Sequence, residues 1–185
     1  MTEMKQISPA VFIPASDQVR FGHADLAQVV RAAETNSLGK ARLLLHAHPD
    51  ATLHEMLIVH VAGQYIQPHV NARSPKSYAM VRGAMLLVLF DDDGRVVGKD
   101  VIGDMSLNLT FLRRFDRPIF HTILPLTKTV AFVETILGPH RETVYAHWAP
   151  PAGTSGAAEY YGQLCATIDF ETERRRFAAQ GTDKT

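Results

Sequence analysis

Two histidines and an asparagine are placed where they could bind a metal ion. His69 and Asn71 are two residues apart, and such residues on a β-strand lie on one face about 7 Å apart, so both side chains can point at one ion. They belong to the pattern G-x5-H-x-N-x4-K-x6-G, which runs from Gly63 to Gly83. His121 follows a proline-containing segment and could supply a further imidazole, a common ligand of Zn, Fe, Ni and Mn. His69, Asn71 and His121 are therefore candidate ligands of a metal ion.

Other residues near this pattern either weaken such a site or could complete it. The amide oxygen of Asn71 is a weaker metal ligand than an imidazole or a carboxylate. Lys76 is less suitable still, because a protonated ammonium repels a cation unless burial lowers its pKa. His46 and His48 form an H-x-H pair that could complete a site of several histidines. The alternative is that His48 lies in a turn before Pro49, and that only His46 faces inward and hydrogen-bonds a backbone carbonyl.

A site without a metal could bind an anionic ligand directly. Tyr78 and Arg82 follow Lys76 by two and six residues, so on a regular strand all three would project to the same side. A pocket with these side chains suits a carboxylate or a phosphate, although a solvated rim is equally compatible with the pattern. Glu55 lies among aliphatic residues and is either a buried acid with a function or an edge residue in water. The candidate ligand-binding residues are therefore Lys76, Tyr78, Arg82 and Glu55.

The elements that must position these residues are mostly β-strands. Apolar residues spaced as i, i+3, i+4 and i+7 predict one helix over about residues 21–38. A period of two then predicts strands at 53–61, 78–90, 105–111 and 129–137. An Asp-Gly turn at 92–95 predicts an antiparallel hairpin. Helical spacing returns over about 155–178, so the chain is expected to be all-β with a helix at each end.

This pattern favours a single domain that spans residues 1–185. Short strands joined by tight turns are typical of a sandwich or a small barrel, which we place at about 40–148, with loose tails at 1–6 and 181–185. Both faces of the segment 53–61 are largely apolar. One face is expected to line the barrel, and a helix or a second subunit is expected to cover the other. A homodimer is predicted on this observation alone.

Composition excludes several classes of partner. The 185 residues carry 19 Lys and Arg against 19 Asp and Glu, so no basic field exists that would bind nucleic acid or an anionic membrane by bulk electrostatics. The longest apolar run, 84–90, is too short to span a bilayer, and residues 1–10 do not resemble a signal peptide. The lone Cys165 cannot form an internal disulfide, which fits a reducing cytoplasm. We therefore expect a cytoplasmic protein with a small-molecule ligand.

Over residues 17–165 the sequence resembles the WbuC family of cupin-fold metalloproteins. The pattern from Gly63 to Gly83 has the spacing of the first cupin motif, with Asn71 in place of the second His and Lys76 in place of the Glu. The segment DRPIFH that ends at His121 takes the position of the second motif. Further landmarks occur in the family's order: RLLLH (42–46), HEML (54–57), YIQPH (65–69), LFDDDG (89–94), HT (121–122), FVE (132–134), GP (138–139) and WAPP (148–151).

The resemblance implies a cupin-type jelly-roll barrel whose interior holds a divalent Fe, Mn, Ni or Zn ion. Members of this family are found with polysaccharide and surface-antigen biosynthesis genes, so a sugar or a nucleotide sugar is the implied ligand, with no reaction assigned. The family also has Glu at the position of Glu134, which could orient Arg42 or a metal-binding histidine. A structural ion pair is the alternative role for Glu134.

Two functions from different classes remain open. The first is a metal-dependent protein in which the ion polarises a carbonyl or hydroxyl group of the substrate. Its candidate metal ligands are His69, His121, Asn71 and His46. The second is a cupin that has lost the metal and binds an anionic small molecule in the barrel. The replacement of Glu by Lys76 favours the second function, and the retained pair of histidines favours the first, which we take as our prediction.

Overall fold

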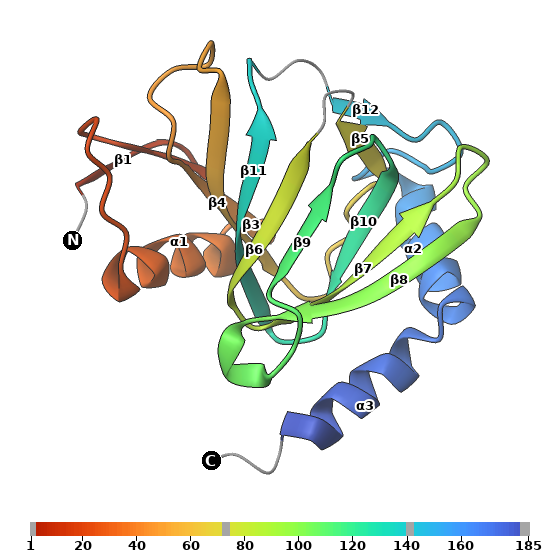
Figure 1. Ribbon diagram of the computed structural model, residues 1–185. Coiled ribbons are helices and arrows are strands. Elements are labelled where there is room, and N and C mark those ends of the chain that lie inside the picture. The colour runs from red at the N-terminus through yellow and green to blue at the C-terminus, as the bar shows by residue number, and fades with distance from the viewer. Residues whose placement is uncertain (1–2, 72–74, 140–142, 182–185) are drawn as a thin grey trace.

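The structure of the chain is a computed structural model that describes residues 3–71, 75–139 and 143–181 (Figure 1). Its strands, in chain order, are β1 (Met4–Ser8), β2 (Val11–Pro14), β3 (Lys40–Leu44), β4 (Leu53–Val61), β5 (His69–Asn71), β6 (Lys76–Arg82), β7 (Ala84–Phe90), β8 (Val96–Gly103), β9 (Leu112–Phe115), β10 (Phe120–Pro125), β11 (Thr129–Leu137) and β12 (Thr143–Tyr145). Its helices are α1 (His23–Thr35), α2 (Ser155–Thr167) and α3 (Phe170–Gly181), and Met105–Leu107 forms a single 3-10 turn, η1.

The strands form two sheets that together make a jelly roll. Within the described residues, one sheet has the order β1-β2-β3-β4-β11-β6-β9 and the other the order β12-β5-β10-β7-β8. From β4 to β11 the chain passes back and forth between the sheets, and every pairing among these eight strands is antiparallel. Eight strands in two such sheets are the jelly-roll architecture, to which cupins belong. The prediction of an all-β cupin-type jelly roll with flanking helices is confirmed.

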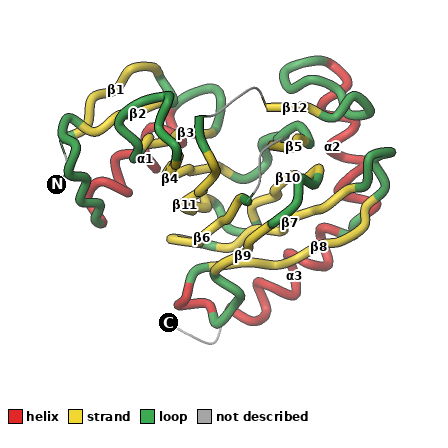
Figure 2. The backbone as a smooth tube through the Cα atoms, turned by 45° about the horizontal axis from the view of Figure 1, so that its top comes forward, coloured by secondary structure: helices red, strands yellow, loops and turns green. Residues whose placement is uncertain are grey.

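Helix α1 covers the outer face of β3 and β4. The spacing that predicted it places Leu26, Val29 and Ala33 on one stripe, and these side chains pack against Leu43 and Leu57 in a buried cluster. Figures 1 and 2 show the helix on this side of the molecule. The apolar outer face of β4, on which we predicted a homodimer, is therefore covered within the chain, and dimerisation stays a prediction without that support.

The C-terminal helical region differs from the single helix predicted over 155–178. It is divided into α2 and α3 at Asp169, whose φ of 53° lies in the left-handed region and cannot continue a helix. Leu164, Ile168 and Phe170 at this bend pack against the outer face of β7, including Phe90. Both helices thus cover the second sheet (Figure 2). In the described ranges no helix is long and apolar enough to cross a membrane.

Three other predictions about local structure are wrong. The strand predicted at 78–90 is divided at Gly83 into β6 and β7, which belong to different sheets. The segment expected as a loose tail at 1–6 contributes to β1, which pairs with β2 in register from Met4 to Ser8. The strand predicted at 105–111 is instead the turn η1 followed by an irregular stretch. The carboxylate of Asp104 caps this turn by accepting hydrogen bonds from the backbone of Ser106 and Gly83, at 2.9 and 2.7 Å. The predicted Asp-Gly hairpin at 92–95 is confirmed between β7 and β8.

Gly83 joins β6 to β7 and is the last residue of the glycine-histidine pattern. Its φ is +74°, and a Cβ at this position would come within 2.5 Å of the carbonyl oxygen of Thr129. Gly83→Ala is therefore expected to lower the free energy of unfolding by at least about 1–2 kcal/mol, measured by urea denaturation. Gly153→Ala is the control, since Gly153 has a φ of +84° with open space around it. Equal losses in the two variants would contradict a steric role for Gly83.

Candidate functional site

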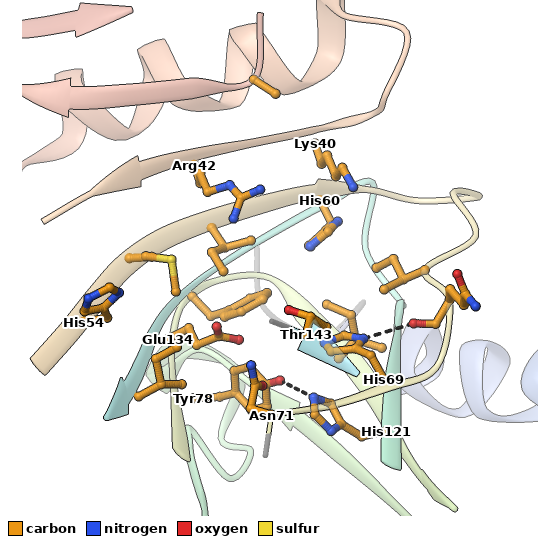
Figure 3. A pocket seen from close by; sticks show the side chains of 18 of the residues that line it. Lys40, Arg42, His54, His60, His69, Asn71, Tyr78, His121, Glu134 and Thr143 are labelled. Atoms are coloured by element: carbon orange, nitrogen blue, oxygen red, sulfur yellow. Dashed lines mark hydrogen bonds between the residues drawn. The ribbon is translucent and has the colours of Figure 1, made fainter. Parts of the chain in front are cut away.

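The jelly roll encloses a cavity of about 790 Å³. Because side chains alternate along a strand, β4 contributes only every second residue to it, namely His54, Met56, Ile58 and His60. Strands β3, β5, β6, β10 and β11 supply most of the remaining wall. Figure 3 shows the polar side chains of this wall pointing towards one another from different strands.

His69 and His121 lie side by side in this cavity, as the sequence predicted. They are partners in the register of β5 and β10, and their ring centroids are 4.6 Å apart. The Nδ1 of each ring hydrogen-bonds a backbone carbonyl two residues earlier, that of Gln67 at 3.0 Å and that of Ile119 at 2.9 Å. A carbonyl can only accept, so each Nδ1 carries the hydrogen and each Nε2 has a free lone pair. This is the tautomer that a metal ligand or a proton acceptor needs.

The lone pair of His121 is directed at Lys76 rather than at open space. The Nζ atom of Lys76 lies 3.1 Å from His121 Nε2, 2.8 Å from Asn71 Oδ1 and 2.9 Å from Glu134 Oε2. The hydroxyl of Tyr78 is 2.8 Å from the same His121 nitrogen. An ammonium group has three hydrogens, and here it meets three acceptors. Lys76 is only 4% exposed and does not itself line the cavity, so its charge is compensated by groups of the protein rather than by a ligand.

Burial and these neighbours determine the charges at the site. Burial by itself would raise the pKa of Glu134, but the nearby Lys76 outweighs burial and holds that pKa below its usual value. Burial lowers the pKa of Lys76, and Glu134 opposes this. Burial lowers the pKa of His69 to about 4, with Lys76 adding to the effect, and lowers that of His121 as well. The site therefore holds an ionised Lys76–Glu134 pair beside two neutral imidazoles.

These residues do not fit a divalent metal ion. The Lys76 ammonium contacts Asn71 and His121, two of the predicted metal ligands, and a metal at their side would lie next to this positive charge. Across the described residues, no group of three or more His, Cys, Asp or Glu side chains is arranged to hold a metal. A zinc or similar centre needs at least three protein ligands. His69 keeps an Nε2 lone pair for which the structure gives no hydrogen bond within the described ranges, but one such ligand does not make a metal site.

His46 lines the cavity but does not join His69. Its Nδ1 lies 3.1 Å from the backbone carbonyl of Glu55, and its ring stacks on that of His54 with centroids 3.9 Å apart. His48 is exposed and precedes a turn that begins at Pro49. This is the alternative arrangement that the sequence left open, with only His46 of the H-x-H pair facing inward.

Besides the buried Lys76, two more of the predicted ligand-binding residues are absent from the cavity lining. Glu55 is on the opposite face of β4 from His54, and its carboxylate accepts a hydrogen bond from Thr135 at 3.4 Å. Arg82 is exposed, because the register of β6 against β11 shifts between Met80 and Arg82 and interrupts the alternation that the prediction assumed. Of the four predicted ligand-binding residues, Tyr78 lines the cavity and Lys76 is buried behind its wall. Glu55 and Arg82 are not part of the site.

Two cavity residues were absent from the sequence prediction. The first is Lys40, which lines the cavity from β3 together with Arg42. Arg42 had been named as a partner for Glu134, but Lys40 had not. The second is His60, which lines the cavity from β4, directly opposite Lys40 in the strand register. Alternation was the signal that could have found them, since Lys40 is two residues before Arg42 and His60 is six after His54. Figure 3 shows all three side chains in one part of the cavity.

Comparison with known proteins gives distant likeness only. A family model described as a domain of unknown function (DUF6016) matches residues 21–102, and no curated protein matches the sequence. The chain is similar to an oxalate oxidase in complex with the substrate analogue glycolate, with a TM-score of 0.47 and 13% identity over 60% of this chain and 57% of that one. It is also similar to Peruvianin-I, a cysteine peptidase from Thevetia peruviana latex, with a TM-score of 0.45 and 14% identity over 60% and 68% of the two chains.

A third similar structure is a mutant of Bacillus subtilis oxalate decarboxylase, with a TM-score of 0.41 and 18% identity over 51% of this chain and 24% of that one. This chain thus spans little more than half of the oxalate oxidase chain and about a quarter of the decarboxylase chain. Proteins with one fold have many activities, so likeness of this degree says nothing about the activity of this chain.

Proposed function

We propose that this chain is a metal-free cupin-type domain that binds a small organic anion in the cavity of its jelly roll. The observation that carries the proposal is the Lys76 ammonium, which donates to Asn71, His121 and Glu134 at 2.8–3.1 Å. A positive charge attached to the protein takes the role that a bound cation would have among these groups. The function predicted first from the sequence, metal-dependent chemistry, is therefore replaced by its alternative.

The size and lining of the cavity support a binding function. A volume of about 790 Å³ lies within the range of sites for small molecules, roughly 300–1,000 Å³. Its wall combines apolar side chains such as Met56, Ile58 and Phe132 with a few hydrogen-bonding groups. Such a lining buries the body of a ligand and orients it through its polar atoms.

The first test of this proposal is the metal content of the protein. Protein purified without chelator and without a nickel column is expected to contain only traces of Fe, Mn, Ni and Zn, because Lys76 already occupies the acceptors. Plasma mass spectrometry measures this content, and EDTA is expected to leave the melting temperature unchanged. Near-stoichiometric metal that disappears in the His69→Ala variant would contradict the proposal.

A second variant tests whether Lys76 is what prevents the site from binding a metal. Lys76→Glu places a carboxylate beside Glu134, His69 and His121, which together would offer enough ligands for Zn²⁺ or Mn²⁺. We expect either ion to raise the melting temperature of this variant and to leave that of the wild-type protein unchanged. The binding half of the proposal is tested separately, by histidine side-chain ¹⁵N spectra recorded with small polar solutes. Cavity histidines that respond to no solute would contradict it.

The finer parts of the sequence prediction remain proposals. The resemblance to the WbuC family, the link to polysaccharide biosynthesis and a sugar or nucleotide sugar as ligand all rest on the ordered landmarks of the sequence. A nucleotide sugar carries phosphate groups and hydroxyls, so it belongs to the chemical class that a metal-free anion-binding cavity would accept. A cytoplasmic location and a homodimer are proposed on the sequence alone.

A further inference from the structure

Two exposed positive charges at the cavity wall have no carboxylate within ion-pair distance among the described residues. Lys40 and Arg42 are two residues apart on β3 and line the cavity together. No Asp or Glu oxygen lies within 4.0 Å of either side chain in the part of the chain that the structure describes. Burial lowers the pKa of Lys40, and the charge of Arg42 lowers it further. The two cations therefore repel each other, and an anion placed between them would relieve that repulsion.

His60 adds an unpaired polar group to the same place. It is opposite Lys40 in the register of β3 and β4, lines the cavity and is only 9% exposed. Its Nδ1 atom has no hydrogen-bond partner within the described ranges. Buried polar atoms of this kind are rare, because leaving one unpaired costs about 1–3 kcal/mol. This Nδ1 atom has almost no accessible surface, so a bound ligand can supply the missing hydrogen bond only after the His60 ring turns towards the cavity.

The charge on the opposite side of the cavity is already neutralised. The carboxylate of Glu134 is 2.9 Å from Lys76, so it does not compensate Lys40 and Arg42 by a direct contact. Among the described residues, the cavity thus has two positive charges without an ion-pair contact at one end and an ion pair at the other. Arg42 reaches Glu134 only over a longer distance, at which its charge helps to lower the pKa of that carboxyl. Figure 3 shows Lys40, Arg42 and His60 together at one end, and Asn71, His69 and His121 at the other.

We propose that Lys40, Arg42 and His60 form an oxyanion subsite that holds the carboxylate or phosphate group of the ligand. The proposal rests on the binding function above and specifies its ligand class. Arg presents a planar set of donors that matches a carboxylate or a phosphate, and Lys adds a point charge. His60 and His69 line the same cavity, so one ligand can contact both the subsite and His69. Because His69 Nε2 can only accept, the ligand has a hydroxyl or another donor at the end that reaches it.

Three solutes on one carbon skeleton test this proposal, namely glycerol, glycerate and glycerol 3-phosphate. Each is titrated into the whole protein at constant ionic strength, and the side-chain ¹⁵N signals of His60 and His69 are recorded. We expect glycerate or glycerol 3-phosphate to shift both histidines with a saturating curve, at least tenfold more tightly than glycerol. A response to one anion only identifies the group as carboxylate or phosphate.

Arg42→Gln and Arg82→Gln are the matched variants, because each removes one positive charge and Arg82 lies outside the cavity. Arg42→Gln is expected to weaken binding of the preferred anion by roughly tenfold or more, and Arg82→Gln to leave it within about twofold. Equal losses in both variants would show that binding follows the overall charge and would overturn the subsite. A His69 response to glycerol that neither anion improves would overturn the subsite and leave cavity binding intact. No response to any of the three solutes would overturn both.

Discussion

Replacing Lys76 with methionine is expected to lower the free energy of unfolding by about 3–5 kcal/mol. The substitution keeps much of the side-chain volume but leaves the buried Glu134 carboxylate without its ion-pair partner at 2.9 Å. It also removes hydrogen bonds to Asn71 and His121. Urea denaturation at pH 7 measures the loss. The metal content of the variant is expected to stay at trace level, since the substitution adds no ligand.

A double-mutant cycle separates the ion pair from general disruption. Glu134→Gln alone is expected to be strongly destabilising for the same reason, because it leaves the ammonium unbalanced. The double variant, with Lys76→Met as well, is expected to lose clearly less than the sum of the two single losses. Lys128→Met is the control, since Lys128 pairs with Glu34 on the surface and is 83% exposed. Losses that simply add, or a Lys76→Met protein as stable as the wild type, would contradict an ion pair that holds the site together.

Stability is also expected to fall steeply as the pH drops from about 6.5 towards about 4. Burial lowers the pKa of His60 to about 3 and that of His69 to about 4, from an ordinary value of 6.5. Between these values the unfolded chain binds protons that the folded chain does not, so unfolding is favoured as the pH falls. His69 alone accounts for a loss on the order of 3 kcal/mol over this window. Urea denaturation at several pH values gives the slope of the free energy of unfolding against pH.

The carboxylate of Glu134 acts in a separate and lower pH window. Lys76 holds the pKa of Glu134 below its usual value of 4.5, so its contribution is present above about pH 4.5 and is lost below it. His69→Gln is expected to flatten the slope between pH 6.5 and 4 and to leave the lower window unchanged. His147→Gln, at an exposed histidine, is expected to change the pH dependence of stability in neither window. A wild-type protein equally stable at pH 6.5 and 4.5 would show that these histidines are not buried neutral groups.

Local sequence patterns predicted much of the fold correctly. The alternation on β4 predicted that one of its faces lines the barrel and that the other is covered, and the Asp-Gly turn predicted the hairpin of β7 and β8. The resemblance to the two cupin motifs implied that His69 and His121 face one site, although 51 residues lie between them, and the structure pairs them. These predictions succeeded because a period of two and a turn residue constrain the backbone wherever they occur.

The parts that failed depend on contacts between distant residues. Lys76 was expected to meet a ligand, but Glu134 from β11 neutralises it, and nothing near either residue in the sequence signals this pair. Arg82 was a candidate for the cavity, with a solvated rim as the equal alternative. A shift in register turns it outward, and such a shift depends on the neighbouring strand. A motif can thus place side chains correctly while a partner elsewhere in the chain decides their charge and their use.

The three hydrogen bonds of Lys76 have a consequence for how this protein would behave in a cell. A metal ion can be taken by a chelator, exchanged for a competing ion or change its oxidation state. An amino group attached to the backbone can do none of these. If the site is built around Lys76, the protein is complete as soon as it folds, and its performance does not vary with the supply of iron, manganese or zinc. The cost of this independence is reactivity, since an ammonium with three protein acceptors offers no open coordination position to a substrate.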